Sequence, residues 1–241
     1  MSVLRQPRIS AVRTLLDLNG PLIGPLLYLF EAVRSYIEER KEAFDARFGT
    51  DTAAPVFGRD RTPGAYFYVA TTASLIYEIL NSLALSPDTF AFVDMGSGKG
   101  RALLIASEFA FAKIVGVELS ANLHRIAQEN IKLYSPASQP CTNFELNCMN
   151  VVDYKYGPEP VVLFLFDPFG RETVRSVIAN LEASLSENPR EAYVVYVYPQ
   201  FEDVLQGSRM LRRVREGGPP WRPWSRYVVY AASPPNSASA G

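Results

Sequence analysis

The chain has 241 residues, enough for one α/β domain of roughly 150 residues and an appendage. Apolar residues make up 48% and charged residues 20%, an ordinary globular composition that excludes a wholly disordered chain. The 24 Lys and Arg residues are balanced by 25 Asp and Glu residues. General nucleic-acid binding needs a basic excess or stripe, so we expect none here.

Metal and membrane functions are not indicated by the residue pattern. Cys141 and Cys148 form no CxxC pair, and His124 has no cluster of ligands around it, so we expect no metal site and a reduced, cytoplasmic protein. No apolar run reaches the roughly 18–20 residues of a membrane span. The N-terminus also lacks an uninterrupted signal-peptide core, so we expect no membrane partner.

The first part of the chain predicts helices. Apolar residues recur at three- and four-residue spacing from Leu22 to Phe48, which predicts one long amphipathic helix. A turn-rich loop follows at 49–55, and a second helix is expected from Thr72 to Leu83. We interpret residues 1–62 as a helical extension that acts as a lid, residues 63–233 as the main domain, and residues 234–241 as a disordered tail.

From Phe90 onward, short apolar runs alternate with helical patterns, which predicts crossover units and a parallel sheet. The last two runs have no room for a helix between them and predict an antiparallel hairpin. The expected fold class is therefore α/β, a doubly wound, mostly parallel seven-stranded sheet that ends in this hairpin. The expected strands are Phe90–Met95, Ile114–Val117, Phe144–Met149, Val161–Phe166, Tyr193–Tyr198, Leu211–Arg215 and Arg226–Ala231, and the helices between them are Ala102–Phe111, Ala121–Tyr134 and Glu172–Leu185.

A glycine-rich run, Asp94-Met-Gly-Ser-Gly-Lys-Gly-Arg101, follows the first of these strands directly. Open α/β sheets bind ligands at this place, because glycines let a ligand approach the backbone and the next helix offers unpaired amides. A nucleotide-triphosphate loop would need Ser or Thr after Lys99, where Gly100 stands. Arg101 weakens a dinucleotide fingerprint, which needs a small residue there. A tight turn without a ligand is the remaining alternative.

The motif Asp94-x-Gly96-x-Gly98-x-Gly100 resembles the first motif of class I S-adenosylmethionine (SAM)-dependent methyltransferases. The resemblance covers about Tyr66 to Ala232, includes the terminal hairpin of that family's seven-stranded sheet, and implies SAM as the cofactor. Glu118 stands 22 positions after Gly96, where the family's acidic residue binds both ribose hydroxyls. The Gly-Ser-Gly-Lys-Gly-Arg loop resembles in particular a poorly characterised bacterial group.

The same resemblance implies a wider set of cofactor contacts. The segment from Tyr68 to Thr72 is similar to one that closes over the cofactor in protein-lysine methyltransferases without a SET domain, although Thr71 and Thr72 could instead cap a helix. Either Asn150 or Asp153 would meet the adenine. The expected cofactor-binding residues are Tyr68, Thr71, Asp94, Gly96, Ser97, Gly98, Gly100, Glu118, Leu119, Asn150, Val151 and Asp167.

The acceptor side is indicated by Asp167-Pro168-Phe169, at the end of the fourth expected strand. This run resembles the Asp/Asn-Pro-Pro-Tyr/Phe motif of enzymes that methylate amino nitrogens, which implies a catalytic role for all three residues. A carboxylate at an apolar strand end needs a partner, and an aromatic ring can pack on a cationic acceptor. The alternative is that Asp167 caps the next helix.

We therefore expect a SAM-dependent methyltransferase that acts on an amino nitrogen of a protein or small molecule. Three alternatives stay open at this stage: a small-molecule O-methyltransferase, a methyltransferase-like module that binds SAM without catalysis, and a nicotinamide-dependent reductase. The acceptor and the oligomeric state are not indicated by the sequence.

Overall fold

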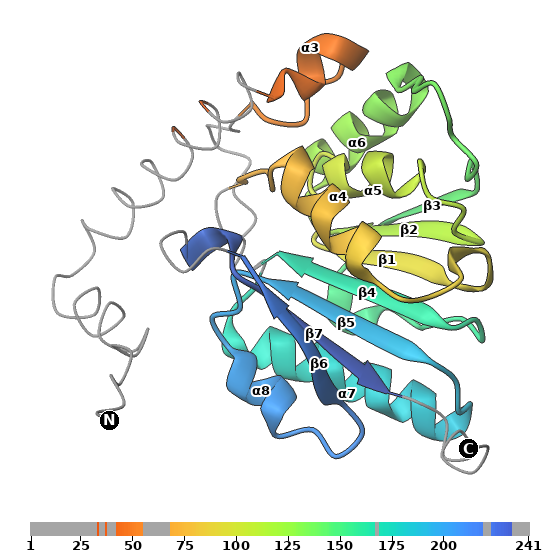
Figure 1. The fold of residues 1–241 in the computed structure, drawn as a ribbon, viewed down its shortest axis with the longest axis vertical. Helices are drawn as coiled ribbons and strands as arrows, with labels where there is room; N and C mark the ends of the chain where they lie inside the picture. The colour runs from red at the N-terminus through yellow and green to blue at the C-terminus, as the bar shows by residue number, and fades with distance from the viewer. Residues whose placement is uncertain are drawn as a thin grey trace, which may run out of the picture.

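The protein is described by a computed structural model that covers Val33, Ile37 and residues 42–54, 68–166, 169–218 and 223–232. Within these residues a seven-stranded sheet runs in the order β3-β2-β1-β4-β5-β7-β6 (Figure 1). Neighbouring pairs among β1 to β5 are parallel, whereas β7 is antiparallel to both β5 and β6. The strands are β1 Ala91–Met95, β2 Lys113–Glu118, β3 Phe144–Cys148, β4 Val161–Phe166, β5 Ala192–Val197, β6 Arg212–Gly217 and β7 Tyr227–Ala232.

Helices cover both faces of this sheet, because the central strands are apolar on both sides (Figure 1). One face packs against α4 and α5, and the other packs against α7 and α8. α6 lies beside α5 over β2 and β3. The helices are α3 Phe44–Phe48, α4 Ala73–Ser82, α5 Arg101–Ala106, α6 Ala121–Leu133, α7 Arg171–Glu187 and α8 Glu202–Gln206.

The strand order reverses between β1 and β4. β1 pairs with β2 on one side and with β4 on the other, so the loops that follow β1 and β4 leave the sheet in opposite directions. In open α/β sheets a crevice forms at such a switch point, outside the carboxyl ends of the strands. The glycine-rich loop after β1 therefore lies at the expected ligand-binding edge.

The predicted fold class is confirmed, including the antiparallel hairpin of β6 and β7, but two predicted details are wrong and one helix was not predicted. The helix expected from Leu22 to Phe48 is interrupted at Ala43, which has a left-handed backbone (φ 52°), and a separate helix, α3, begins at Phe44. The helix expected to continue to Phe111 ends at Ala106. α8 was not predicted, because its five residues are too short to show a helical period.

The interruption at Ala43 has a physical cause. Phe44 turns into the core beside Tyr134, whereas Val33 and Ile37, on the same predicted stripe, are each 49% exposed. The side chain of Glu42 accepts hydrogen bonds from the backbone amides of Ala73 and Ser74, which are the first two residues of α4. A carboxylate from the N-terminal extension thus stabilises the start of α4, a role that the sequence analysis had considered for Thr71 and Thr72. The expected tail at 234–241 lies outside the described residues.

We expect Leu103→Ala to lower the free energy of unfolding by about 2–5 kcal/mol, because it leaves a cavity where α5 packs on the sheet. Leu133→Ala on α6 is the matched control, since its side chain is 56% exposed, and it should change that free energy by less than about 1 kcal/mol. Urea unfolding of both proteins gives the comparison. Equal destabilisation by the two substitutions would contradict this assignment of the core.

Candidate cofactor site

The glycine loop folds back over the end of β2. Gly96, Gly98 and Gly100 all have left-handed backbones, with φ of 80°, 54° and 87°. Side chains are disfavoured in this region, which explains why glycine occupies all three positions. The amides of Gly96 and Ser97 donate to the carbonyl of Val117 at 2.8 and 3.1 Å, so the loop is held against the neighbouring strand.

Glu118, the last residue of β2, anchors the same loop with its side chain. Its Oε2 accepts a hydrogen bond from the amide of Gly98 at 2.8 Å, and its Oε1 accepts one from the amide of Ser120 at 2.7 Å. Burial raises the pKa of this carboxyl, against the effect of these backbone hydrogen bonds. A carboxylate has about four acceptor positions, so Glu118 retains the capacity to accept two ribose hydroxyls while it holds the loop.

A second buried carboxyl, Asp94, lies in β1 beside Glu118. Burial raises the pKa of Asp94 to about 8, and the charge of Glu118 adds to the increase. Leu119, which follows Glu118 in the chain, is unusually exposed for a leucine at 42% and offers an apolar surface at the carboxyl end of β2. The site thus combines acidic groups, which can bind hydroxyls and a cationic ligand, with an apolar surface and an open glycine backbone. This combination fits the chemistry of SAM.

Tyr68 covers the glycine loop. A Cβ built on Gly98 would lie 2.3 Å from Cε2 of Tyr68, so the ring packs directly on the glycine. The Tyr68 hydroxyl donates to the carbonyl of Thr52, and burial raises the pKa of this hydroxyl. Thr71 is buried, and its carbonyl accepts from Nη1 of Arg101 at 3.3 Å. Tyr68 and Thr71, which precede the glycine motif in the sequence, therefore contact the loop and the helix α5 that follows it.

The residues after β3 lie next to Glu118, because the amide of Met149 donates to the Glu118 carbonyl at 3.0 Å. Asn150 and Asp153 are both exposed there, and the Asn150 side chain accepts from the amide of Val152 at 3.2 Å. Either residue is therefore available to an adenine ring. Val151 differs from them, since its side chain is buried in the core.

On the acceptor side, the chain leaves the sheet at Phe166, whereas Asp167 and Pro168 lie outside the described residues. Phe169 is partly buried and packs against the core on the α7 face. The N-cap of α7 is Gly170, which takes the position that the helix-cap alternative had assigned to Asp167.

Lys99 and Arg101 have roles that were not predicted from the sequence, because both side chains are buried, at 1% and 4% exposed. Both charges reach residues 45–54 of the N-terminal extension. A usable signal was present: a basic residue at the start of a helix is unfavourable next to the helix dipole, and the rest of α5 is apolar. Such an arginine needs acceptors from another segment, which the sequence pattern alone does not identify.

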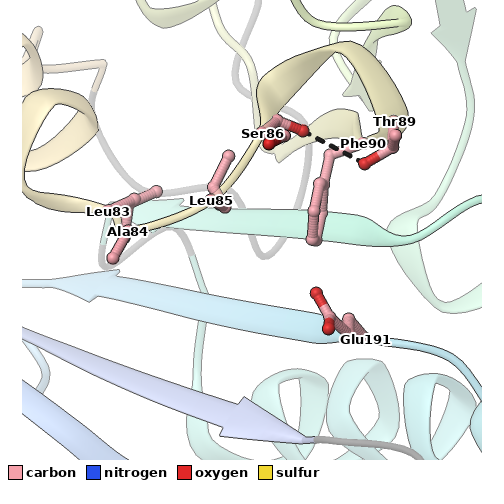
Figure 2. A pocket seen from close by; sticks show the side chains of 7 residues that line it. All are labelled: Leu83, Ala84, Leu85, Ser86, Thr89, Phe90 and Glu191. Carbon is pink, nitrogen blue, oxygen red and sulfur yellow. Dashed lines mark hydrogen bonds between the residues drawn. The ribbon is translucent and has the colours of Figure 1, made fainter.

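A separate hollow of about 640 Å³ lies at the opposite edge of the sheet (Figure 2). It is lined by Phe90, just before β1, by Glu191, just before β5, and by residues after α4. It is therefore not part of the glycine-loop site. Among the described residues, no three His, Cys, Asp or Glu side chains are placed to share a metal ion. None of the helices in that part of the chain is long and apolar enough to span a membrane.

Comparisons with known proteins agree with this geometry. Residues 61–152 match the model of a family described as histone methylation protein DOT1. This region includes the segment around Tyr68, the glycine loop, Glu118 and Asn150. No curated protein sequence matches the chain.

Solved structures with a similar fold include 23S rRNA methyltransferase ErmE, with 13% identity over 68% of both chains and a TM-score of 0.46. Another is an RNA methyltransferase from Salinibacter ruber in complex with S-adenosylhomocysteine, with 19% identity over 72% of this chain and 98% of that chain, and a TM-score of 0.45. A ribosomal protein L11 methylase from Lactobacillus delbrueckii subsp. bulgaricus has 17% identity over 68% and 78%, and a TM-score of 0.45.

The glycine motif, the strand order and the family match identify the chain as a class I SAM-dependent methyltransferase. Its cofactor is SAM. The methyl acceptor is not determined by these matches.

The raised pKa of Asp94 makes stability depend on pH. Because the folded pKa of about 8 lies well above the ordinary pKa of an aspartate, the folded state holds this proton more tightly than the unfolded state. Stability from this group is complete below about pH 4 and is lost as the pH rises through about 8. Asp94→Asn should reduce this loss, measured by thermal unfolding between pH 5 and 9, whereas Asp88→Asn at an exposed position should not. Identical pH profiles for wild type and Asp94→Asn would contradict the assignment.

Gly98→Val should abolish binding of S-adenosylhomocysteine. The substitution places a branched side chain at a left-handed backbone position and drives its Cβ into the Tyr68 ring. Calorimetric titration measures the affinity, with Gly207→Ala as the control, since Gly207 has an ordinary helical backbone and only van der Waals neighbours. Binding by Gly98→Val as tight as that of wild type would exclude this loop from the cofactor site.

Proposed function

We propose that this methyltransferase transfers the methyl group to an amino nitrogen, and that Asp167, Pro168 and Phe169 form the acceptor side of its site. The observation that carries the proposal is the position of the β4 end. Leu165 of β4 pairs with Met95 of β1, so the chain leaves β4 next to the start of the glycine loop. The sequence Asp167-Pro168-Phe169 follows directly, and an acceptor must approach the cofactor at this edge.

The chemistry of an amine acceptor suits an acidic residue at this point. Bound SAM supplies a methyl group on a positively charged sulfur. Asp167 would accept hydrogen bonds from the N–H groups of the amine, which orients the nitrogen lone pair toward the methyl carbon. Its negative charge would also stabilise the positive charge that develops on nitrogen during transfer. Phe169 would contribute from a packed position rather than as a free side chain, since it is already partly buried against the core.

A protein is the acceptor class that we favour. The matching family is described by histone methylation, so its acceptor is a protein. The overall charge of this chain is −1, without the basic excess that general nucleic-acid binding requires. An RNA or small-molecule acceptor is therefore treated as an alternative outcome of the experiment.

Asp167→Ala should lower the single-turnover rate of methyl transfer about a hundredfold or more, with nearly unchanged affinity for S-adenosylhomocysteine, because one preorganised partner of the acceptor is lost. Asp167→Asn keeps one acceptor oxygen, so its single-turnover rate should lie between those of the wild type and Asp167→Ala. The wild type and each variant are incubated with methyl-labelled SAM and cell extract. The extract is then separated into protein, RNA and small molecules, and the label in each fraction is measured. Asp88→Ala, at the opposite edge of the sheet, is the control.

Label in protein, released as methylated amine on hydrolysis, is the expected result. Label in RNA or in a hydroxyl product would overturn the N-methylation proposal. An Asp167→Ala protein that keeps its turnover would overturn the proposed role of Asp167 in methyl transfer.

A further inference from the structure

Residues 45–54 form a compact turn that is built around one carboxylate. Oδ1 of Asp45 accepts from the hydroxyls of Thr50 and Thr52 at 2.8 and 2.6 Å. Oδ2 accepts from the amides of Thr52 and Ala53 at 2.9 and 2.8 Å. Hydrogen bonds to an ionised acceptor are stronger than neutral ones, so this side chain fixes the conformation of the segment.

Arg101 docks this turn on the first residue of α5, directly after the glycine loop. Its Nε donates to the Thr52 hydroxyl at 2.7 Å, and its Nη2 lies 3.6 Å from Oδ2 of Asp45. The guanidinium also lies over the ring of Phe44, 5.2 Å from its centre. A buried charge of this kind is costly unless it is paired, which ties the conformation of the loop end to the presence of the segment.

Lys99, inside the loop, makes a second connection. Its Nζ donates to Oδ1 of Asp51 and to the carbonyl of Ala54, both at 2.8 Å. Asn130 of α6 closes the arrangement, since its Nδ2 donates to the carbonyls of both Asp51 and Lys99 at 3.0 and 2.9 Å, and its Oδ1 accepts from the Asp51 amide at 2.8 Å. The loop and the segment therefore share one hydrogen-bond network.

The segment also contacts the loop through Tyr68. The carbonyl of Thr52 accepts from the Tyr68 hydroxyl, and the Tyr68 ring packs on Gly98, the glycine whose amide is bound by Glu118. Thr52 thus contacts both Arg101, the residue directly after the loop, and Tyr68, whose ring packs on the loop. The segment is therefore bonded to Lys99 within the loop, to Arg101 directly after it, and to Tyr68, which packs on it.

We infer that residues 45–54 are a positioning segment for SAM binding, with Asp45, Lys99 and Arg101 as its positioning residues. Because three residues of the loop are glycines with left-handed backbones, ordering the loop costs conformational entropy. The docked segment holds the loop in its ordered conformation before the cofactor binds. Docking and cofactor binding are then coupled, and the coupling is reciprocal. This inference rests on the cofactor part of the function and does not depend on the acceptor.

Arg101→Lys and Arg190→Lys form a matched pair of variants. Arg190 is also a buried arginine, 7% exposed, and its guanidinium donates to the carbonyls of Glu159, Ser184 and Asn188 before β5, at the opposite edge of the sheet. Both variants should lower the melting temperature. Only Arg101→Lys should weaken binding of S-adenosylhomocysteine, by about tenfold in calorimetric titration, because typical coupling factors between sites lie in this range.

Hydrogen exchange provides the reciprocal measurement on the unmodified protein. Saturating S-adenosylhomocysteine should slow exchange of the Thr52 and Ala53 amides, which are bonded to Asp45. Asp45→Asn should abolish this protection, and Tyr68→Phe, which loses only the hydroxyl, should weaken binding by a smaller factor. These two variants replace Arg101→Lys if that protein does not fold.

The inference is overturned if Arg101→Lys or Asp45→Asn binds S-adenosylhomocysteine as tightly as Arg190→Lys does, or if the ligand leaves the exchange of Thr52 and Ala53 unchanged. Wild-type protein that does not bind S-adenosylhomocysteine would remove the cofactor assignment and this inference together. A methyl acceptor other than an amine would overturn the proposed function alone.

Discussion

The hydrogen bond from the amide of Gly98 to the carboxylate of Glu118 is the interaction on which the site depends. It joins the end of β2 to a loop whose glycines would otherwise sample many conformations. Glu118 also lies beside a second buried carboxyl, Asp94, whose pKa is raised to about 8 by its own burial and further by the negative charge of Glu118. A cationic cofactor would compensate this buried negative charge, so the same arrangement that orders the loop favours the ligand.

Two buried cations extend this constraint beyond the sheet. The side chains of Lys99 and Arg101 both bond to residues 45–54, and Arg101 also donates to the Thr71 carbonyl. The loop is therefore held by carboxylates from two distant parts of the sequence, Glu118 and, through Arg101, Asp45. Because burial of an unpaired charge is strongly unfavourable, the loop, α5 and residues 45–54 are expected to fold as one unit.

The sheet topology explains why cofactor and acceptor residues can meet. β1 and β4 are adjacent and parallel, so Met95 pairs with Leu165 although the two residues are 70 positions apart in the sequence. The cofactor loop and the Asp167-Pro168-Phe169 run therefore begin at one edge. The hollow lined by Phe90 and Glu191 lies at the amino ends of the strands instead (Figure 2).

The sequence by itself determined the fold class and the cofactor. The alternation of apolar strands with helices, the glycine motif and Glu118 are local patterns, because they depend on backbone periodicity and on the steric freedom of glycine. The strand limits of β4 and the hairpin of β6 and β7 were predicted closely for the same reason. Asp94, Gly98 and Glu118 were found in one place because a parallel sheet brings its strand ends together.

Only the tertiary structure decided how the N-terminal extension meets this site. The apolar stripe from Leu22 to Phe48 predicted a continuous helix, but the left-handed backbone of Ala43 ends it before Phe44. The partners of Lys99 and Arg101 in residues 45–54 lie 45 to 56 positions away in the sequence, and no periodic pattern connects them. A buried ion pair depends on where two segments pack, and this packing is a property of the folded chain rather than of either segment.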